Sequence, residues 1–179
     1  MKKVLQFCLA AALGLGTAGL AAATPLDNDS AAQQRIMRQV RHELVMLPYF
    51  GIYDNLAYKV DGDTVTLLGQ VRNATLKNDA ANAVKHIEGV EHVNNQIEVL
   101  PSSFNDDRIR REEARAIFRD SRLSHYSIQS VPPIHIIVRN GHVTLEGVVS
   151  NKGDKDMAFM RANGVAGVFS VDNNLRIEK

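Results

Sequence analysis

Six histidines are the side chains of this sequence best suited to hold a metal ion: His42, His86, His92, His125, His135 and His142. None lies in an H-E-x-x-H motif, and none has a second histidine four residues away, the spacing that places two imidazoles on one helix face. We therefore expect histidines that pack or face solvent, and no metal site.

The acidic pairs Asp106-Asp107 and Glu112-Glu113 are the next candidates for chemistry. They open or line a predicted helix, where acids near the N-terminus interact favourably with the helix dipole. After residue 23 the sequence has no serine in a G-x-S-x-G motif, no P-loop and no G-x-G-x-x-G motif. The sequence indicates a protein that is not an enzyme and uses no cofactor.

Five arginines are spaced along a helix predicted over residues 106–123: Arg108, Arg111, Arg115, Arg119 and Arg122. At 100° per residue they fall within roughly 80° of arc, with Ile117 on the opposite side. The planar guanidinium group can hold phosphate oxygens through two hydrogen bonds. The stripe is either a solvated face paired with Asp107 and Glu112, or a binding surface for anionic headgroups or an acidic partner.

An internal repeat predicts the elements that position these residues. Residues 65–99 align without a gap with residues 143–177, and twelve of the thirty-five pairs are identical, where unrelated sequences would give roughly two. A repeat of this length indicates a duplicated structural unit. We predict two modules, residues 31–100 (module one) and 105–179 (module two), joined by a linker at 101–104.

Each module reads helix–strand–strand–helix–strand. In module one we expect a helix from Ser30 to Pro48, strands over 56–60 and 65–71, a helix over 76–87 and a strand over 93–99. Four glycines recur in the repeat: Gly69 and Gly147, where we expect a helix or a twisted backbone to cross closely, and Gly89 and Gly167, placed to end a helix. The fold class is α+β: two tandem αββαβ modules, each with a three-stranded mixed sheet packed by two helices.

The repeat also shows where the two modules differ. Asp79, Ala81 and Asn82 in module one correspond to Met157, Phe159 and Met160 in module two. Three large apolar side chains at a helix edge need a partner surface. That partner is the other module, a lipid surface or an exposed apolar segment of another protein, and Arg161 nearby would add attraction to anionic lipid.

The first residues have the pattern of a secretory signal peptide. Met1-Lys2-Lys3 is basic, residues 4–20 are mostly apolar, and Ala21-Ala22-Ala23 forms a cleavage site. We expect cleavage after Ala23, a flexible lead over residues 24–30, and no transmembrane span afterwards. Cys8, the only cysteine, lies in the apolar segment outside a lipid-attachment motif, so we expect no lipoprotein. With a net charge of −1 after cleavage, we expect no nucleic-acid partner.

The chain resembles the BON domain family, of the osmotically inducible periplasmic protein type. The resemblance rests on V-x-L-x-G-x-V at Val65 and Val143, and on the closing G-V-x-x-V-x-N-x-[IL] at Gly89 and Gly167. It implies tandem αββαβ domains in the periplasm of Gram-negative bacteria, and peripheral binding to phospholipid or envelope proteins in support of envelope integrity or osmotic stress tolerance. It also implies an alternative, a periplasmic chaperone that shields unfolded exported proteins. The oligomeric state and the arrangement of the modules stay open.

Overall fold

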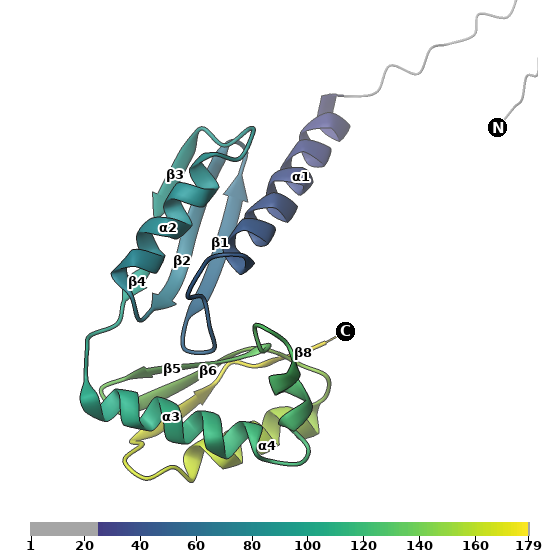
Figure 1. Cartoon of the computed structure of the whole chain (residues 1–179). Coiled ribbons are helices and arrows are strands. Elements are labelled where there is room, and N and C mark those ends of the chain that lie inside the picture. The colour runs from purple at the N-terminus through teal and green to yellow at the C-terminus, as the bar shows by residue number, and fades with distance from the viewer. Residues whose placement is uncertain (1–24, 179) are drawn as a thin grey trace, which may run out of the picture.

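The computed structural model describes residues 25–178 and contains two modules of the same design (Figure 1). The elements of module one are α1 (Pro25–Val45), β1 (Asn55–Asp61), β2 (Thr64–Val71), α2 (Ala74–Lys85), β3 (His92–Asn95) and β4 (Glu98–Val99). Those of module two are α3 (Phe104–Phe118), the 3-10 helix η1 (Ser124–Ile128), β5 (Ile134–Arg139), β6 (His142–Val149), α4 (Lys152–Asn163), β7 (Ser170–Asn173) and β8 (Arg176–Ile177). The predicted α+β class and the tandem αββαβ plan are confirmed.

Each sheet is mixed, with its second strand at the centre. β2 pairs antiparallel with β1 and parallel with β3 and β4, and β6 does the same with β5, β7 and β8. The expected single strand over 93–99 is divided into β3 and β4. The side chain of Asn95 accepts from the N–H of Ile97 and donates to the carbonyl of Lys77, which turns the chain there. Asn173 makes the matching contacts in module two.

Three of the expected boundaries differ in the structure. α3 ends at Phe118 rather than at residue 123, so Arg119 and Arg122 lie beyond its last residue. α1 begins at Pro25 rather than at Ser30, so the residues expected to form a flexible lead are helical; proline suits the first position of a helix. α2 ends at Lys85, before Gly89. Gly89 instead takes a φ of +90° in the turn closed by the bond from the N–H of Val90 to the carbonyl of Ile87. A positive φ at the third position of a turn requires glycine, and Gly167 has the same role.

Gly69 and Gly147 occupy the most crowded backbone positions in the sheets. A Cβ added at Gly69 would lie 2.1 Å from the carbonyl oxygen of Asn55, and one at Gly147 would lie 1.9 Å from that of Pro133. Both glycines have a positive φ, of 114° and 121°. The expected close approach is therefore real, and the neighbour is the backbone at the start of the adjacent strand.

Each module has its own hydrophobic core between its helices and one face of its sheet. When the helices are aligned at their last residues, the three buried residues of α1 fall on buried residues of α3, and one of these three pairs differs in chemical type. Ile36 and Leu44 then correspond to Ile109 and Ile117, whereas Val40 corresponds to Glu113. Module two thus has a fully buried carboxyl group where module one has a valine.

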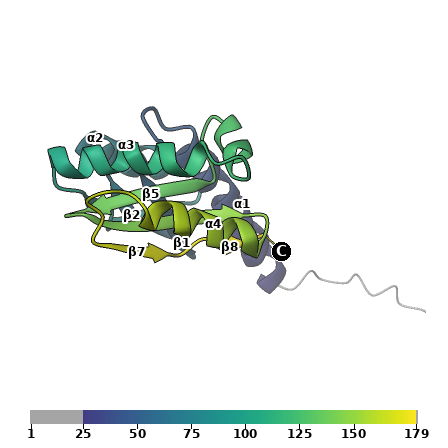
Figure 2. The same ribbon diagram turned by 90° about the horizontal axis from the view of Figure 1, so that it is seen from below.

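Module one sits on the face of the second sheet that points away from α3 and α4 (Figures 1 and 2). Along β5, Ile134, Ile136 and Val138 point into the core of module two, so His135 and Ile137 point toward module one. Ile137 is 5% exposed. The outer surfaces of α3 and α4 are therefore left uncovered by module one.

Candidate functional site

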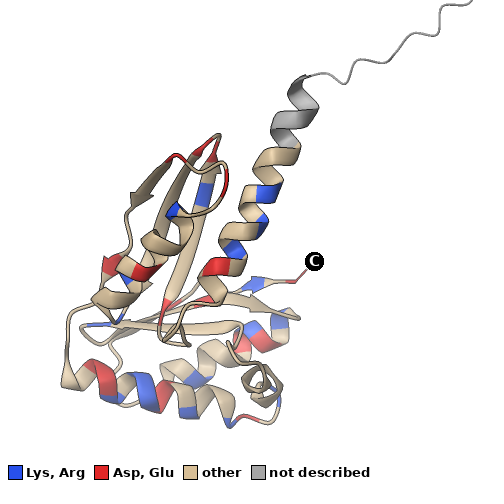
Figure 3. Cartoon of the chain, turned by 45° about the horizontal axis from the view of Figure 1, so that its top comes forward, with Lys and Arg blue, Asp and Glu red and all other residues tan. Residues whose placement is uncertain are grey.

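The arginine stripe runs along the exposed side of α3 and continues past its end at Arg119 and Arg122. The hydroxyl of Ser103 caps the helix by accepting from the N–H of Asp106, and Ile109, Glu113 and Ile117 face the core. All five arginines named above are exposed. In Figure 3 the ribbon of this helix carries blue segments for basic residues interleaved with red segments for acidic ones. The helix face predicted from the sequence is the face that solvent reaches.

Three of the five arginines have partners within module two. Arg108 donates to the carbonyl of Ala166 at 3.1 Å and to Asn105 at 3.0 Å. Arg115 pairs with Glu112 at 2.8 Å, and Arg122 lies 3.7 Å from the carboxylate of Asp154. Among the described residues, Arg111 and Arg119 form no ion pair. Because the partners of Arg108 are uncharged, three of the five arginines keep an uncompensated positive charge.

A shallow groove of about 440 Å³ separates α3 from the end of α4. Its lining consists of Arg108, Glu112, Arg115, Ala116, Arg119, Gly164, Val165 and Ala166. Three arginines and one glutamate therefore border the same hollow, which gives it a net positive charge. This arrangement suits a phosphate group approached from solvent, because each guanidinium offers paired donors to phosphate oxygens.

The three large apolar residues of α4 divide into one that is half-buried and two that are exposed. Met157 packs against the core of module two, whereas Phe159 and Met160 are 39% and 58% exposed. Neither of these two is covered by module one, which answers the question that the sequence left open. The helical spacing places Met160 opposite the core residues Ala158 and Ala162, so it shares the outer surface with the arginine stripe.

Arg161 is held in place by an ion pair with α3. Its guanidinium contacts the carboxylate of Asp120 at 2.6 Å. The pKa of Asp120 is lowered, first by the hydrogen bond from the N–H of Arg122 and then by Arg161. Arg161 therefore joins α4 to the end of α3, and its own charge is largely balanced.

Charge divides unequally between the two halves of the chain. Residues 24–104 contain seven Lys and Arg against ten Asp and Glu, a net −3, and residues 105–179 contain twelve against ten, a net +2. Burial also raises the pKa of Glu113 to about 8, so at pH 7 this residue is mostly neutral and module two is more positive still. An anionic surface would select module two over module one.

The junction between the modules is built by the loop that precedes β1. The carbonyl of Ile52 accepts from the N–H of Ile136 at the free edge of β5, at 2.7 Å. The ring of Phe50 stacks on His135, with centroids 5.6 Å apart, and Arg139 forms an ion pair with Glu98. The pairing of this loop with β5 could not be predicted, because a single backbone bond leaves no pattern in the sequence.

Perturbed ionisable groups are found at this junction, but they do not form a reactive cleft. Burial raises the pKa of Asp54, whose carboxylate accepts from the N–H groups of Gly51 and Arg72. Burial lowers the pKa of His135 and raises that of Tyr53. Asp54 is thus engaged by backbone groups of the loop and of the turn that follows β2.

Two further absences hold for residues 25–178. No group of three or more His, Cys, Asp or Glu side chains there is arranged to hold a metal ion. None of the helices in this part of the chain has both the length and the apolar character that crossing a bilayer requires. The expected signal peptide falls in residues 1–23, outside the described part.

Comparison with known proteins gives one informative match. The family model described as "BON domain" matches twice, at residues 28–101 and 105–179. Two solved structures of CdsD, a structural protein of the type III secretion system of Chlamydia trachomatis, are similar at 12% identity and a TM-score of 0.29. They cover 80% and 81% of this chain, and 98% and 94% of their own, and at these scores they bear on no functional argument. A comparison with curated protein sequences finds no match.

Proposed function

The chain belongs to the BON domain family, and we propose that it is a non-enzymatic periplasmic protein that binds anionic phospholipid surfaces through the outer face of α3 and α4. In this role it would support envelope integrity or osmotic stress tolerance. The observation that carries the proposal is the position of this face. It is cationic, bears exposed apolar side chains, and lies on the side of module two that module one leaves uncovered.

Two kinds of interaction would contribute to this binding. Arg111 and Arg119 have no ion pair to break among the described residues, and each basic side chain near an anionic membrane contributes about 1 kcal/mol. Met160 and Phe159 would bury part of their exposed surface at the boundary between headgroups and acyl chains. Because only a few groups take part, we expect weak, reversible binding that high salt reduces.

Co-sedimentation with vesicles tests the proposal. The mature chain should pellet with vesicles of phosphatidylcholine and phosphatidylglycerol but not with phosphatidylcholine alone. Changing Phe159→Asp together with Met160→Asp should reduce the bound fraction at least tenfold, because two charges would have to approach an anionic surface in place of two apolar groups.

A matched control adds the same charge elsewhere. Asn78→Asp with Asn82→Asp places two carboxylates on the exposed side of α2 in module one, and this variant should pellet like the wild type. Equal losses in both variants would mean that net charge alone governs binding. Absence of binding to either vesicle, with suppression of aggregation of an unfolded protein that depends on Phe159 and Met160, would favour the chaperone function instead.

A further inference from the structure

A second exposed apolar feature lies at the end of module two where α3 begins. Phe104 is 98% exposed and Phe169 is 74% exposed, which makes them the two most exposed phenylalanines of the described chain. A side chain of this size gains free energy wherever it can leave water.

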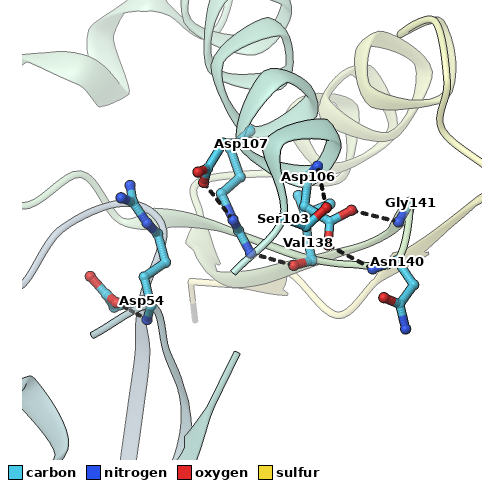
Figure 4. Close-up of polar contacts among 9 residues, drawn as sticks. Asp54, Ser103, Asp106, Asp107, Val138, Asn140 and Gly141 are labelled. Carbon is cyan, nitrogen blue, oxygen red and sulfur yellow. Dashed lines mark hydrogen bonds and ion pairs between the residues drawn. The ribbon is translucent and has the colours of Figure 1, made fainter. Parts of the chain in front are cut away.

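Hydrogen bonds bring these two residues to the same end of the module. The carboxylate of Asp106, two residues after Phe104, accepts from the N–H groups of Asn140 at 2.8 Å and Gly141 at 2.9 Å (Figure 4). The N–H of Phe169 donates to the carbonyl of Gly141, and a Cβ added at Gly141 would lie 2.7 Å from the Phe169 ring. The start of α3, the β5–β6 turn and the α4–β7 loop therefore meet here.

The fold does not require phenylalanine at either position. Glu91 occupies the place of Phe169 in module one, and its N–H makes the equivalent bond, to the carbonyl of Asp63. Ala31 occupies the place of Phe104 when α1 and α3 are aligned at their last residues. The turn at Glu91 and Phe169 is thus equivalent in the two modules, whereas Ala31 lies inside α1, which begins six residues earlier than this position. Only module two carries aromatic rings at these two places.

The electrostatics of this end favour an anionic partner. Asp106 is 1% exposed and is engaged by backbone donors, and Asp107 is paired with Arg110 at 2.7 Å. The cations Arg108 and Arg111 follow Phe104 at spacings of four and seven residues, so all three lie on one face of α3. Asp107 is therefore paired and the carboxylate of Asp106 is buried and held by backbone donors, whereas the cations Arg108 and Arg111 are exposed on the face of α3 that carries Phe104.

We propose that Phe104 and Phe169 insert into the headgroup–acyl boundary of an anionic bilayer and orient module two with the start of α3 deepest in the membrane. This inference rests on the proposed function and adds an insertion site and an orientation to it. The phospholipid bilayer is the partner that fits best, because two exposed rings near exposed arginines match an interface that is apolar inside and anionic outside.

The absence of tryptophan from the chain allows a direct test. Three single variants, Phe104→Trp, Phe169→Trp and Ile128→Trp, are mixed with phosphatidylcholine–phosphatidylglycerol vesicles that carry brominated acyl chains. Ile128 is 82% exposed on η1, beyond the other end of α3, and serves as the control. The probes at positions 104 and 169 should shift to shorter emission wavelength and be quenched at least twofold, and the probe at 128 should do neither.

A deletion variant supplies a second readout. Phe104→Ala with Phe169→Ala should lower vesicle affinity about tenfold, as expected for partial burial of two rings, without a change in the circular dichroism spectrum. If the wild type sediments with vesicles but neither probe is quenched, the proposal that this end of module two inserts is wrong, while the proposed function still holds. If the wild type does not sediment, both fail. Equal quenching at position 128 would show binding without the proposed orientation.

Discussion

Replacing Gly147 by alanine is expected to unfold module two. The added methyl group would lie 1.9 Å from the carbonyl oxygen of Pro133, which is backbone and cannot move without breaking the β5–β6 pairing. A φ of +121° adds strain for any residue with a side chain. We expect a loss of roughly 4 kcal/mol or more, comparable to the whole stability of a small domain. Urea denaturation followed by circular dichroism would measure it.

The control for this substitution is another glycine of the same module. A Cβ at Gly164 meets nothing closer than 3.6 Å, and its φ of −85° is ordinary. Gly164→Ala should therefore change stability by less than about 1 kcal/mol. Limited proteolysis of Gly147→Ala should cut within residues 105–178 while module one, whose core is separate, resists. A Gly147→Ala protein as stable as the wild type would contradict the described strand geometry.

Replacing Glu113 by leucine is expected to stabilise module two substantially. Both carboxyl oxygens of Glu113 are buried without a hydrogen-bond partner, and burial raises its pKa from an ordinary 4.5 to about 8. At pH 7 the folded chain keeps this proton and the unfolded chain has lost it, at a cost of order 3 kcal/mol. Leucine removes this cost and fills a site where module one has Val40. The free energy of unfolding at pH 7 should rise by roughly 2–4 kcal/mol.

The sign of the pH dependence distinguishes the cost of keeping Glu113 protonated from a gain in stability due only to better packing of leucine. Below pH 4.5 Glu113 is protonated in both states and contributes no pH dependence. From there to about pH 8 the folded state holds a proton that the unfolded state releases, so stability falls as pH rises. Glu113→Gln should abolish this slope, and Glu112→Gln, at an exposed ion pair, should retain it. The difference between wild type and Glu113→Gln at each pH cancels the contributions of Asp54 and His135. An unchanged slope in Glu113→Gln would contradict this assignment.

The duplication made the fold predictable from sequence. The constant spacing of 78 residues showed which residues of the two modules are equivalent in the sheets. The alternation of apolar residues indicated which face of each strand is buried. The division of the third strand was not predicted, because it depends on Asn95 reaching across to the carbonyl of Lys77 in α2. The early start of α1 was missed because Ser30 is a good capping residue in sequence terms.

The candidate site was only partly visible in the sequence. Helical spacing placed the arginines on one face, but which of them are free depends on contacts with residues distant in sequence, such as that between Arg108 and Ala166. Met157 looked exposed by comparison with Asp79, yet it packs against its own core. The burial of Glu113 could not be predicted from the sequence, because the first helices of the two modules are not related by the 78-residue spacing of the repeat. The correspondence between Glu113 and Val40 is therefore seen only in the structure.

Binding through the outer face of module two is tested most directly by comparing two charge reversals in one vesicle-binding titration. Arg111→Glu with Arg119→Glu acts on the free cations of α3, and Arg35→Glu with Arg38→Glu makes the same charge change on exposed residues of α1. With phosphatidylglycerol-containing vesicles, we expect the double variant on α3 to bind about thirtyfold more weakly than the wild type, or weaker still. The affinity of the double variant on α1 should stay within about threefold of wild type. Equal losses from both pairs, or no loss from the α3 pair, would contradict binding through the outer face of module two.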